Sequence, residues 1–204
     1  MPKVLIIGQD GLIGSMMMRA FAARGWTIMG TTRRPDPAGR AIALDLADAN
    51  SARTMPLPEA DVVLLAAAMA RFAECRAAPE RARAVNVEAP LAIAERFAAR
   101  GARSVLISTS AVFDGSRARV PAKSPTRPAS DYGRLKAEAE QGILALGPWG
   151  AVVRLTKVLH AGHALFAGWR DALRRGEPIE AFADLSFAPI AATDVETGIM
   201  AAAA

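Results

Sequence analysis

The sequence is poor in cysteine, histidine and aromatic residues. Its single cysteine, Cys75, excludes an internal disulfide and fits a reducing compartment. Two histidines and one cysteine make no constellation of metal ligands, so we expect no metal site. Aromatic residues make up only 5% of the chain, which argues against base-stacking surfaces and therefore against a nucleic-acid partner.

Long hydrophobic runs are missing too. The longest, at 62–70 and 4–7, are far too short to span a membrane. A predicted strand follows Met1 almost at once, which leaves no room for a signal peptide. We therefore expect a cytoplasmic protein with no membrane partner.

Apolar and basic residues, by contrast, are plentiful. The 204 residues, 52% of them hydrophobic, suffice for one domain with a buried core. A net charge of +5 suits an anionic partner, either a nucleic acid or a small ligand such as a nucleotide. Because the arginines are spread along the chain and not gathered in one tract, the small ligand is favoured.

Short apolar runs alternate with helical patterns along most of the chain. Strands are expected at 4–7, 26–30, 41–44, 61–65, 104–107 and 151–155. Helices are expected at 12–24, 81–100 with a kink or restart at Pro90, 131–146, 166–175 and 194–204. A proline-bearing loop at 114–130 and a short strand pair within 177–187 complete the pattern. The alternation predicts an α/β fold, a Rossmann-like doubly wound parallel sheet with helices on both faces.

A glycine motif follows the first strand and opens the first helix. Gly8, Gly11 and Gly14 permit a tight turn and close approach of a pyrophosphate to the backbone. The N–H groups near Leu12 and Ile13 then face that anion. The alternative is a plain Asp-Gly turn, but the strand–turn–helix context favours dinucleotide binding.

The end of the second strand indicates which dinucleotide binds. An acidic residue there would favour NAD, but the chain has Arg33 and Arg34 and no carboxylate until Asp36. Guanidinium groups match a 2′-phosphate, so NADP is the expected cofactor, with NAD left open. The alternative is that both arginines are merely solvated.

Tyr132 and Lys136 stand four residues apart, so on a helix they share one face. A nearby cation lowers the pKa of a phenol, and such a pair can move a proton to or from a substrate oxygen. By itself the spacing occurs on many ordinary helices.

Together these motifs resemble the extended, sugar-nucleotide-modifying branch of the short-chain dehydrogenase/reductase superfamily. Asn86 and the stretch 107–115 stand in family order and are similar to the dTDP-4-dehydrorhamnose reductase and sugar-nucleotide epimerase group. The resemblance implies that Asp45 and Leu46 line the adenine pocket. It also implies that small residues after the fourth strand pack along the cofactor, namely Ala66, Ala67 and Ala68.

The resemblance further implies a Thr-Tyr-Lys catalytic set. Thr109 would polarise a substrate carbonyl, Tyr132 would donate a proton to its oxygen, and Lys136 would lower the Tyr132 pKa and hold the nicotinamide ribose. The expected activity is NADPH-dependent hydride transfer to a keto sugar nucleotide or a related small carbonyl substrate. Residues 1–160 would form the cofactor-binding domain.

The C-terminal part is short for this branch. Residues 161–204 would form a reduced substrate-side segment packed on the same domain. The sequence leaves open a smaller substrate or a pocket completed by a partner subunit, for example in a homodimer. It also leaves open an epimerase or dehydratase with tightly held cofactor, or a non-catalytic NADP-binding sensor or scaffold.

Overall fold

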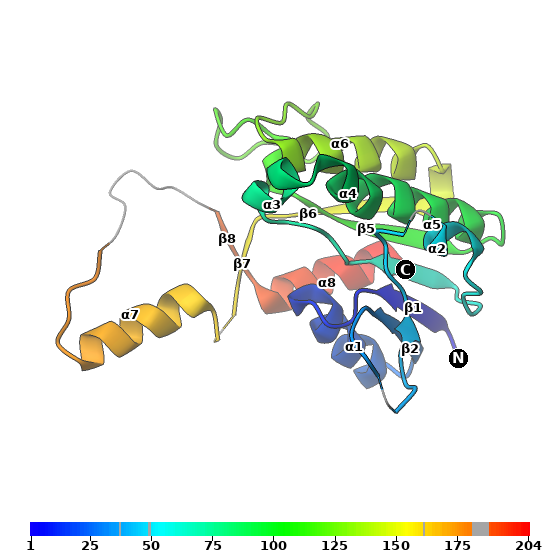
Figure 1. Cartoon of the computed structure of the whole chain (residues 1–204), viewed down its shortest axis with the longest axis horizontal. Coiled ribbons are helices and arrows are strands. Elements are labelled where there is room, and N and C mark those ends of the chain that lie inside the picture. Colours follow the sequence, from blue (N-terminus) through cyan, green and yellow to red (C-terminus); the bar gives the residue numbers. More distant parts are fainter. Residues whose placement is uncertain (37, 49, 161, 181–187) are drawn as a thin grey trace.

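A six-stranded parallel sheet in the order β3-β2-β1-β4-β5-β6 forms the centre of the molecule (Figure 1). The computed structural model describes residues 1–36, 38–48, 50–160, 162–180 and 188–204. The strands are β1 (Lys3–Ile7), β2 (Thr27–Thr32), β3 (Ile42–Ala43), β4 (Val62–Leu65), β5 (Arg103–Thr109) and β6 (Gly150–Leu155). This strand order is that of dinucleotide-binding domains and confirms the predicted doubly wound sheet.

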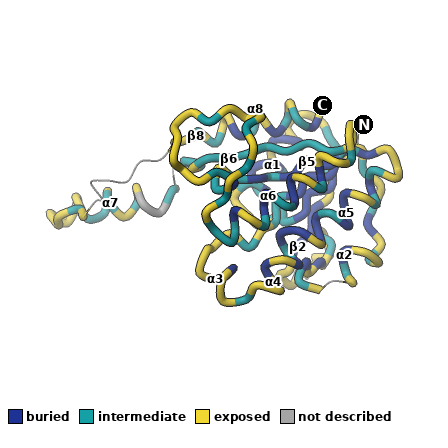
Figure 2. The backbone as a smooth tube through the Cα atoms, turned by 90° about the horizontal axis from the view of Figure 1, so that it is seen from above, coloured by how far each residue is buried: buried dark blue, intermediate teal, exposed yellow. Residues whose placement is uncertain are grey.

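β1 shows how the sequence makes both faces of the sheet apolar. Side chains alternate along a strand, so Val4 and Ile6 pack on one face and Leu5 and Ile7 on the other. All four side chains are buried, because helices cover both faces (Figure 2). A parallel strand in this position is therefore an unbroken apolar run, as the sequence shows.

The helices divide between the two faces (Figure 1). Helices α1 (Leu12–Ala23) and α8 (Ala192–Ala203) contribute buried residues to one apolar cluster. Helices α2 (Ser51–Thr54), α5 (Ala89–Ala98) and α6 (Asp131–Leu144) contribute to the other. Within the described ranges, no helix combines the length and hydrophobicity needed to cross a bilayer.

The helical stretch expected at 81–100 is built from several pieces. Short helices α3 (Phe72–Ala77) and α4 (Pro79–Arg83) lead into a π-helical turn, η1 (Ala84–Glu88), and then into α5. Pro90 is the second residue of α5, which follows η1 without a break, since Ala84, Glu88 and Ala89 all keep helical dihedral angles. The chain therefore does not restart at this proline, and the irregularity is the π-helical turn immediately before α5. Single 3₁₀ turns, η2 (Ser110–Val112) and η3 (Gly147–Trp149), complete this part of the chain.

Beyond β6 the chain leaves the sheet and comes back to it. β7 (Lys157–Leu159) pairs in parallel with β8 (Pro189–Ala191), and between them α7 (Ala164–Arg174) stands apart from the other helices (Figures 1 and 2). The strand pair expected within 177–187 is not found at 177–180, and 181–187 lie outside the described residues. The pairing of β7 with β8 joins residues some thirty positions apart in the chain, which local sequence patterns do not reveal.

Candidate cofactor and catalytic site

The glycine loop between β1 and α1 is packed so tightly that side chains would not fit. Gly8 has a φ of 89°, and a Cβ added there would lie 2.7 Å from the Ala67 Cβ. A Cβ on Gly14 would lie 2.1 Å from the Gly8 carbonyl oxygen. Glycine is therefore required at both positions, and the backbone of this loop is open to close approach by a ligand.

The N-terminus of α1 is left free to bind an anion. Gly11 is the N-cap, no side chain caps the helix, and no acidic residue lies in the first turn. The first N–H groups of a helix have no internal partners and carry a partial positive charge. This end of α1 therefore suits a phosphate group, and the glycine loop keeps its approach clear.

A cleft of about 780 Å³ opens along this loop at the carboxyl ends of the strands. Its volume is in the range of pockets for small molecules and cofactors. Most of the predicted cofactor residues line it: Gly8, Gly11, Arg33, Arg34, Asp45, Leu46, Ala66, Ala67 and Ala68. Leu12, Ile13 and Gly14 are not among the lining residues and lie in the first turn of α1.

Polar side chains outside the predicted motifs join the glycine loop to β2 by hydrogen bonds. The Gly8 N–H donates to Thr31 Oγ1 at 3.0 Å, and Thr32 Oγ1 donates to the Asp10 carboxylate. Both threonines are buried, and Thr31, Thr32 and Asp10 line the cleft. In the sequence, the pair Thr31-Thr32 at the end of the second strand was the feature that could have indicated these contacts.

Arg33 and Arg34 are exposed at the same end of the cleft. Among the residues that the structure describes, no ion pair occupies either guanidinium group. The Arg34 N–H donates to Thr32 Oγ1 at 2.9 Å, which fixes its backbone at the strand end. Both side chains are therefore available to an anionic group in the cleft.

Asn86, in the π-helical turn η1, holds the loop that follows β4. Its side chain is fully buried, donates to the Met69 carbonyl at 3.0 Å and accepts from the Met69 N–H at 3.0 Å. The Cys75 thiol donates to the same carbonyl at 3.1 Å. Because 66–71 line the cleft, these bonds fix the shape of its wall. Cys75 thus has a structural role there.

Thr109 and Tyr132 lie on two elements that are packed tightly together. Thr109 ends β5, and its Oγ1 accepts from the Ala111 N–H at 3.1 Å, an arrangement that leaves the hydroxyl hydrogen to be donated. A Cβ on Gly133, the neighbour of Tyr132, would lie 2.1 Å from the Ala111 carbonyl oxygen. The Ser130 hydroxyl caps α6 by accepting from the Gly133 N–H at 3.1 Å, which sets where Tyr132 begins the helix.

Burial shifts the pKa values of Tyr132 and Lys136 in opposite directions. Desolvation, with a smaller contribution from Cys75, raises the pKa of Tyr132 to about 12. Lys136 is 1% exposed, and desolvation lowers its pKa to about 8, although the nearby Glu140 carboxylate opposes that change. Burial is therefore the main influence on the phenol in this structure, and the expected lowering of the Tyr132 pKa by Lys136 stays a prediction.

The three residues predicted to be catalytic do not line the 780 Å³ cleft but are connected to it. Thr109, Tyr132 and Lys136 are absent from its lining. Arg71 lines the cleft, and the ring of Phe72, which directly follows it, lies 5.9 Å from the Tyr132 ring. Tyr132 is thus connected to the cleft through the neighbour of a lining residue. No cluster of three metal-ligating side chains occurs in the described ranges.

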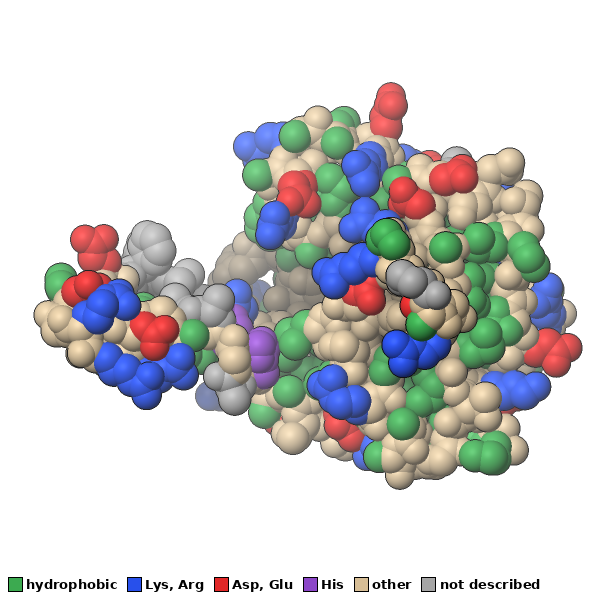
Figure 3. All heavy atoms as spheres, turned by 60° about the horizontal axis from the view of Figure 1, so that its bottom comes forward, with side chains coloured by type: hydrophobic (Ala, Val, Ile, Leu, Met, Phe, Trp, Pro, Cys, Tyr) green, Lys and Arg blue, Asp and Glu red, His purple; other side chains and the backbone are tan. Residues whose placement is uncertain are grey.

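Acidic and basic side chains are mixed on the molecular surface. On the face drawn in Figure 3, Asp and Glu lie among Lys and Arg, so the net positive charge is not concentrated in one continuous patch there. Four arginines line the cleft, namely Arg33, Arg34, Arg71 and Arg81, and Arg71 is paired with Glu74.

Comparisons with known proteins agree with this geometry. The chain is 32% identical over 162 residues to a dTDP-4-dehydrorhamnose reductase of Mycolicibacterium smegmatis, covering 78% of this chain and 47% of the relative. It is 30% identical over 155 residues to methionine adenosyltransferase 2 subunit beta of Bos taurus, covering 75% and 46%. The chain thus spans about half the length of these curated relatives.

A solved structure confirms the fold. The dTDP-4-dehydrorhamnose reductase of Bacillus anthracis, in complex with NADP, superposes with a TM-score of 0.80 at 20% identity, covering 98% of this chain and 70% of that one. A family model described as the RmlD substrate binding domain matches residues 2–204. The resemblance to the dTDP-4-dehydrorhamnose reductase group is confirmed, and the chain belongs to the RmlD substrate binding domain family.

Proposed function

We propose that the protein is an NADPH-dependent reductase of the short-chain dehydrogenase/reductase type, acting on the carbonyl of a keto sugar nucleotide or a related small compound. One observation carries the proposal. A cleft suited to a dinucleotide has a wall that leads, through Phe72, to Tyr132 on the helix face that also bears buried Lys136.

The chain's own residues would hold NADPH along the cleft. The glycine loop and the start of α1 would bind the pyrophosphate, and Asp45 and Leu46 would contact the adenine. Arg33 and Arg34 would bind the 2′-phosphate, since no other charged group engages them among the described residues. Ala66, Ala67 and Ala68 would lie along the cofactor, where only small side chains leave room.

The cofactor, when bound, supplies a hydride from nicotinamide C4. The other groups come from the chain. Tyr132, with a pKa of about 12, keeps its proton at neutral pH and is able to donate it to a carbonyl oxygen. Thr109 would donate its hydroxyl hydrogen to the same oxygen, and the Lys136 ammonium would donate to ribose hydroxyls.

The substrate class comes from the relatives. The name of the Mycolicibacterium smegmatis protein describes reduction of a keto sugar nucleotide. We propose a substrate of that class for this chain, with residues 1–160 as the cofactor-binding domain and 161–204 on the substrate side. The shared N-terminal motifs and the family membership support this choice.

The proposal is tested by following NADPH oxidation over a panel of 4-keto sugar nucleotides and simple ketones, with NADH as comparison. We expect NADPH to be preferred, and Tyr132→Phe to abolish turnover while NADPH binding, measured by fluorescence titration, is retained. Thr109→Val should also lower kcat strongly, whereas Ser110→Ala, at the exposed neighbouring position, should not. Unchanged turnover in Tyr132→Phe would refute the mechanism.

A second candidate is an NADP-binding subunit without its own turnover. The similarity to methionine adenosyltransferase 2 subunit beta favours it, since that relative is named as a subunit of a larger enzyme. Tight NADPH binding together with no oxidation over the whole substrate panel would favour this role over the reductase.

A further inference from the structure

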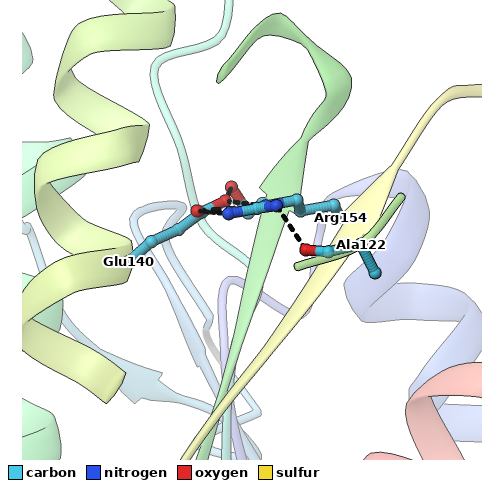
Figure 4. A network of polar contacts seen from close by, with 4 residues as sticks. Ala122, Glu140 and Arg154 are labelled. Carbon is cyan, nitrogen blue, oxygen red and sulfur yellow. Dashed lines mark hydrogen bonds and ion pairs between the residues drawn. The ribbon is translucent and has the colours of Figure 1, made fainter. Parts of the chain in front are cut away.

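A buried ion pair joins α6 to β6 behind the catalytic set. Glu140 is 1% exposed and accepts from Arg154 in a two-pronged arrangement, with Nε–Oε1 at 3.0 Å and Nη2–Oε2 at 2.6 Å. Figure 4 shows the Arg154 side chain lying between Glu140 and the backbone of Ala122. Such bidentate pairs fix the orientation of both side chains.

Both members of the pair also contact other parts of the chain. The Ser108 hydroxyl donates to Glu140 Oε1 at 2.5 Å. Arg154 Nη1 donates to the Ala122 carbonyl at 2.7 Å, and the guanidinium lies 5.0 Å from the centre of the Phe113 ring. The pair therefore holds the end of β5 on one side and the proline-bearing loop at 114–130 on the other.

These contacts all lie next to the catalytic set. Glu140 follows Lys136 by four residues and Tyr132 by eight, so the three share one face of α6. Ser108 immediately precedes Thr109, and the loop tied at Ala122 runs from η2 to Tyr132. The two elements that carry the proposed catalytic residues are β5 and α6. The ion pair contacts β5 through Ser108, and Glu140 itself belongs to α6.

The titratable and charged groups near Lys136 and Tyr132 can be named one by one. Glu140 is the charged group that raises the Lys136 pKa against the effect of burial, and Cys75 on α3 acts on Tyr132. Arg83 on α4 pairs with Glu138 of α6 and with Glu88 of η1, at partly exposed positions. Arg154 on β6 is paired with Glu140 itself.

Burying an ion pair is no route to stability in itself, because apolar side chains of similar size usually stabilise as well. The placement of this one suggests a use. Resting on the reductase proposed above, we infer that Glu140 and Arg154 are positioning residues. Glu140, one helical turn from Lys136 on the same face of α6, favours the charged form of its ammonium. Arg154 fixes Glu140 and ties the 114–130 loop so that Thr109 and Tyr132 keep their relative positions.

The Glu140 part is tested without turnover. The chain has four lysines, so ¹³C-labelled lysine gives a simple NMR spectrum in which Lys136 is assigned with Lys136→Met. We expect Glu140→Gln to lower the titration midpoint of Lys136 by about one pH unit or more. Glu138→Gln, on the same helix but paired with Arg83, should leave it unchanged. An unchanged midpoint in folded Glu140→Gln, or an equal shift in Glu138→Gln, would overturn this part.

Glu140→Gln leaves Arg154 without its counter-charge, which destabilises the fold. A second variant is therefore used if Glu140→Gln does not fold. The double variant Glu140→Gln/Arg154→Met removes both charges together. We expect the Lys136 midpoint in it to lie below the wild-type value, by less than in Glu140→Gln because the lost Arg154 charge acts in the opposite direction. A midpoint that is not lowered would overturn this part.

The Arg154 part has a separate readout. Arg154→Lys keeps the positive charge but loses the planar guanidinium group, which donates to Glu140 and to the Ala122 carbonyl at the same time. We expect faster hydrogen exchange of amides in the 114–130 loop and little change in the Lys136 midpoint. Unchanged exchange in the loop would show that Arg154 does not anchor it.

Turnover then separates the two proposals. If the wild type reduces a substrate of the panel, the high-pH limb of its rate profile should move to lower pH in Glu140→Gln, together with the NMR midpoint. If the wild type reduces none, the reductase proposal fails, while the NMR and exchange results still decide whether Glu140 and Arg154 position this site. A limb that stays in place while the NMR midpoint moves would overturn their link to catalysis.

Discussion

At the scale of single residues, Lys136 makes the fold less stable than it would otherwise be. Its ammonium is buried, and its pKa falls from 10.5 to about 8. A group whose pKa is depressed on folding adds stability above its unfolded pKa, and that stability is lost as pH falls through the folded value. At pH 7 the protein therefore keeps a charged lysine in an unfavourable place, which is consistent with selection for function.

We expect Lys136→Met to raise the free energy of unfolding at pH 7 by on the order of 3 kcal/mol, because methionine fills the buried site without a charge. The gain should shrink as pH rises from 7 toward 10, where folded Lys136 has released its proton. Tyr132, with its pKa raised from 10.0 to about 12, affects stability only above that range.

Urea denaturation at several pH values measures the effect, with Lys123→Met in the exposed loop as the control. A difference between wild type and Lys136→Met that does not vary with pH would contradict the expected depression of the Lys136 pKa.

The same scale shows where sequence patterns stop being informative. Tyr132 and Lys136 were predicted from their spacing, but the raised pKa of Tyr132 was not, since it depends on burial by α3. Glu140 reads as an ordinary surface residue of a helix. In the sequence, Arg154 is the charged residue within the otherwise apolar strand β6, and a partly buried charge needs a partner.

At the scale of elements, the junction of α6 with η2 determines where α6 begins. Gly133 lies so close to Ala111 that no Cβ fits between them, and its added Cβ would also lie 3.0 Å from Pro128. The helix start, the 3₁₀ turn after Thr109 and the end of the loop thus meet at one glycine.

We expect Gly133→Ala to push α6 away from η2. The strain should lower the free energy of unfolding by about 1–3 kcal/mol and reduce kcat, while NADPH binding at the separate cleft is largely kept. Gly198→Ala, at an exposed position of α8 with open space around it, should instead stabilise by up to about 1 kcal/mol. Chemical denaturation and steady-state kinetics compare the two; equal effects would show that the junction is not constrained.

Elements whose signals are local were predicted well. The apolar runs of β1, β4 and β5, the helix α1 after its glycine turn and the helix α6 capped by Ser130 follow from their own sequences. The short helix α2 and the pair β7–β8 were not predicted, because their residues carry no local pattern and the strand pairing depends on contacts far away in the chain. The π-helical turn η1 depends likewise on the position that Asn86 takes against Met69.

At the scale of the whole molecule, α8 packs against the central sheet although it follows the outlying α7 in the chain. Val195, Ile199 and Ala203 of α8 are buried in the core, and Glu196 pairs with Arg24 of the segment after α1 at 2.8 Å. The chain therefore closes its core with its last helix, and α7 is carried on the connection between (Figure 1).

This arrangement predicts the outcome of limited proteolysis. Trypsin should cut first in or just after α7, where Arg170, Arg174 and Arg175 lie on the outlying segment. The two fragments should stay together in gel filtration, because α8 remains packed on the sheet, and should separate only on denaturation. Release of the C-terminal fragment from the native protein, or a first cut between β1 and β6, would contradict this picture.

The parallel pair β7–β8 has a consequence for how such a protein changes over time. Three residue pairs, from Lys157 with Pro189 to Leu159 with Ala191, bring the two ends of the outlying segment together at the edge of the core. Everything between them is one contiguous insertion, whose length and composition are replaceable without rerouting a strand. A domain of this design is able to exchange that single segment for another, while the cleft beside the glycine loop and helix α6 are inherited unchanged.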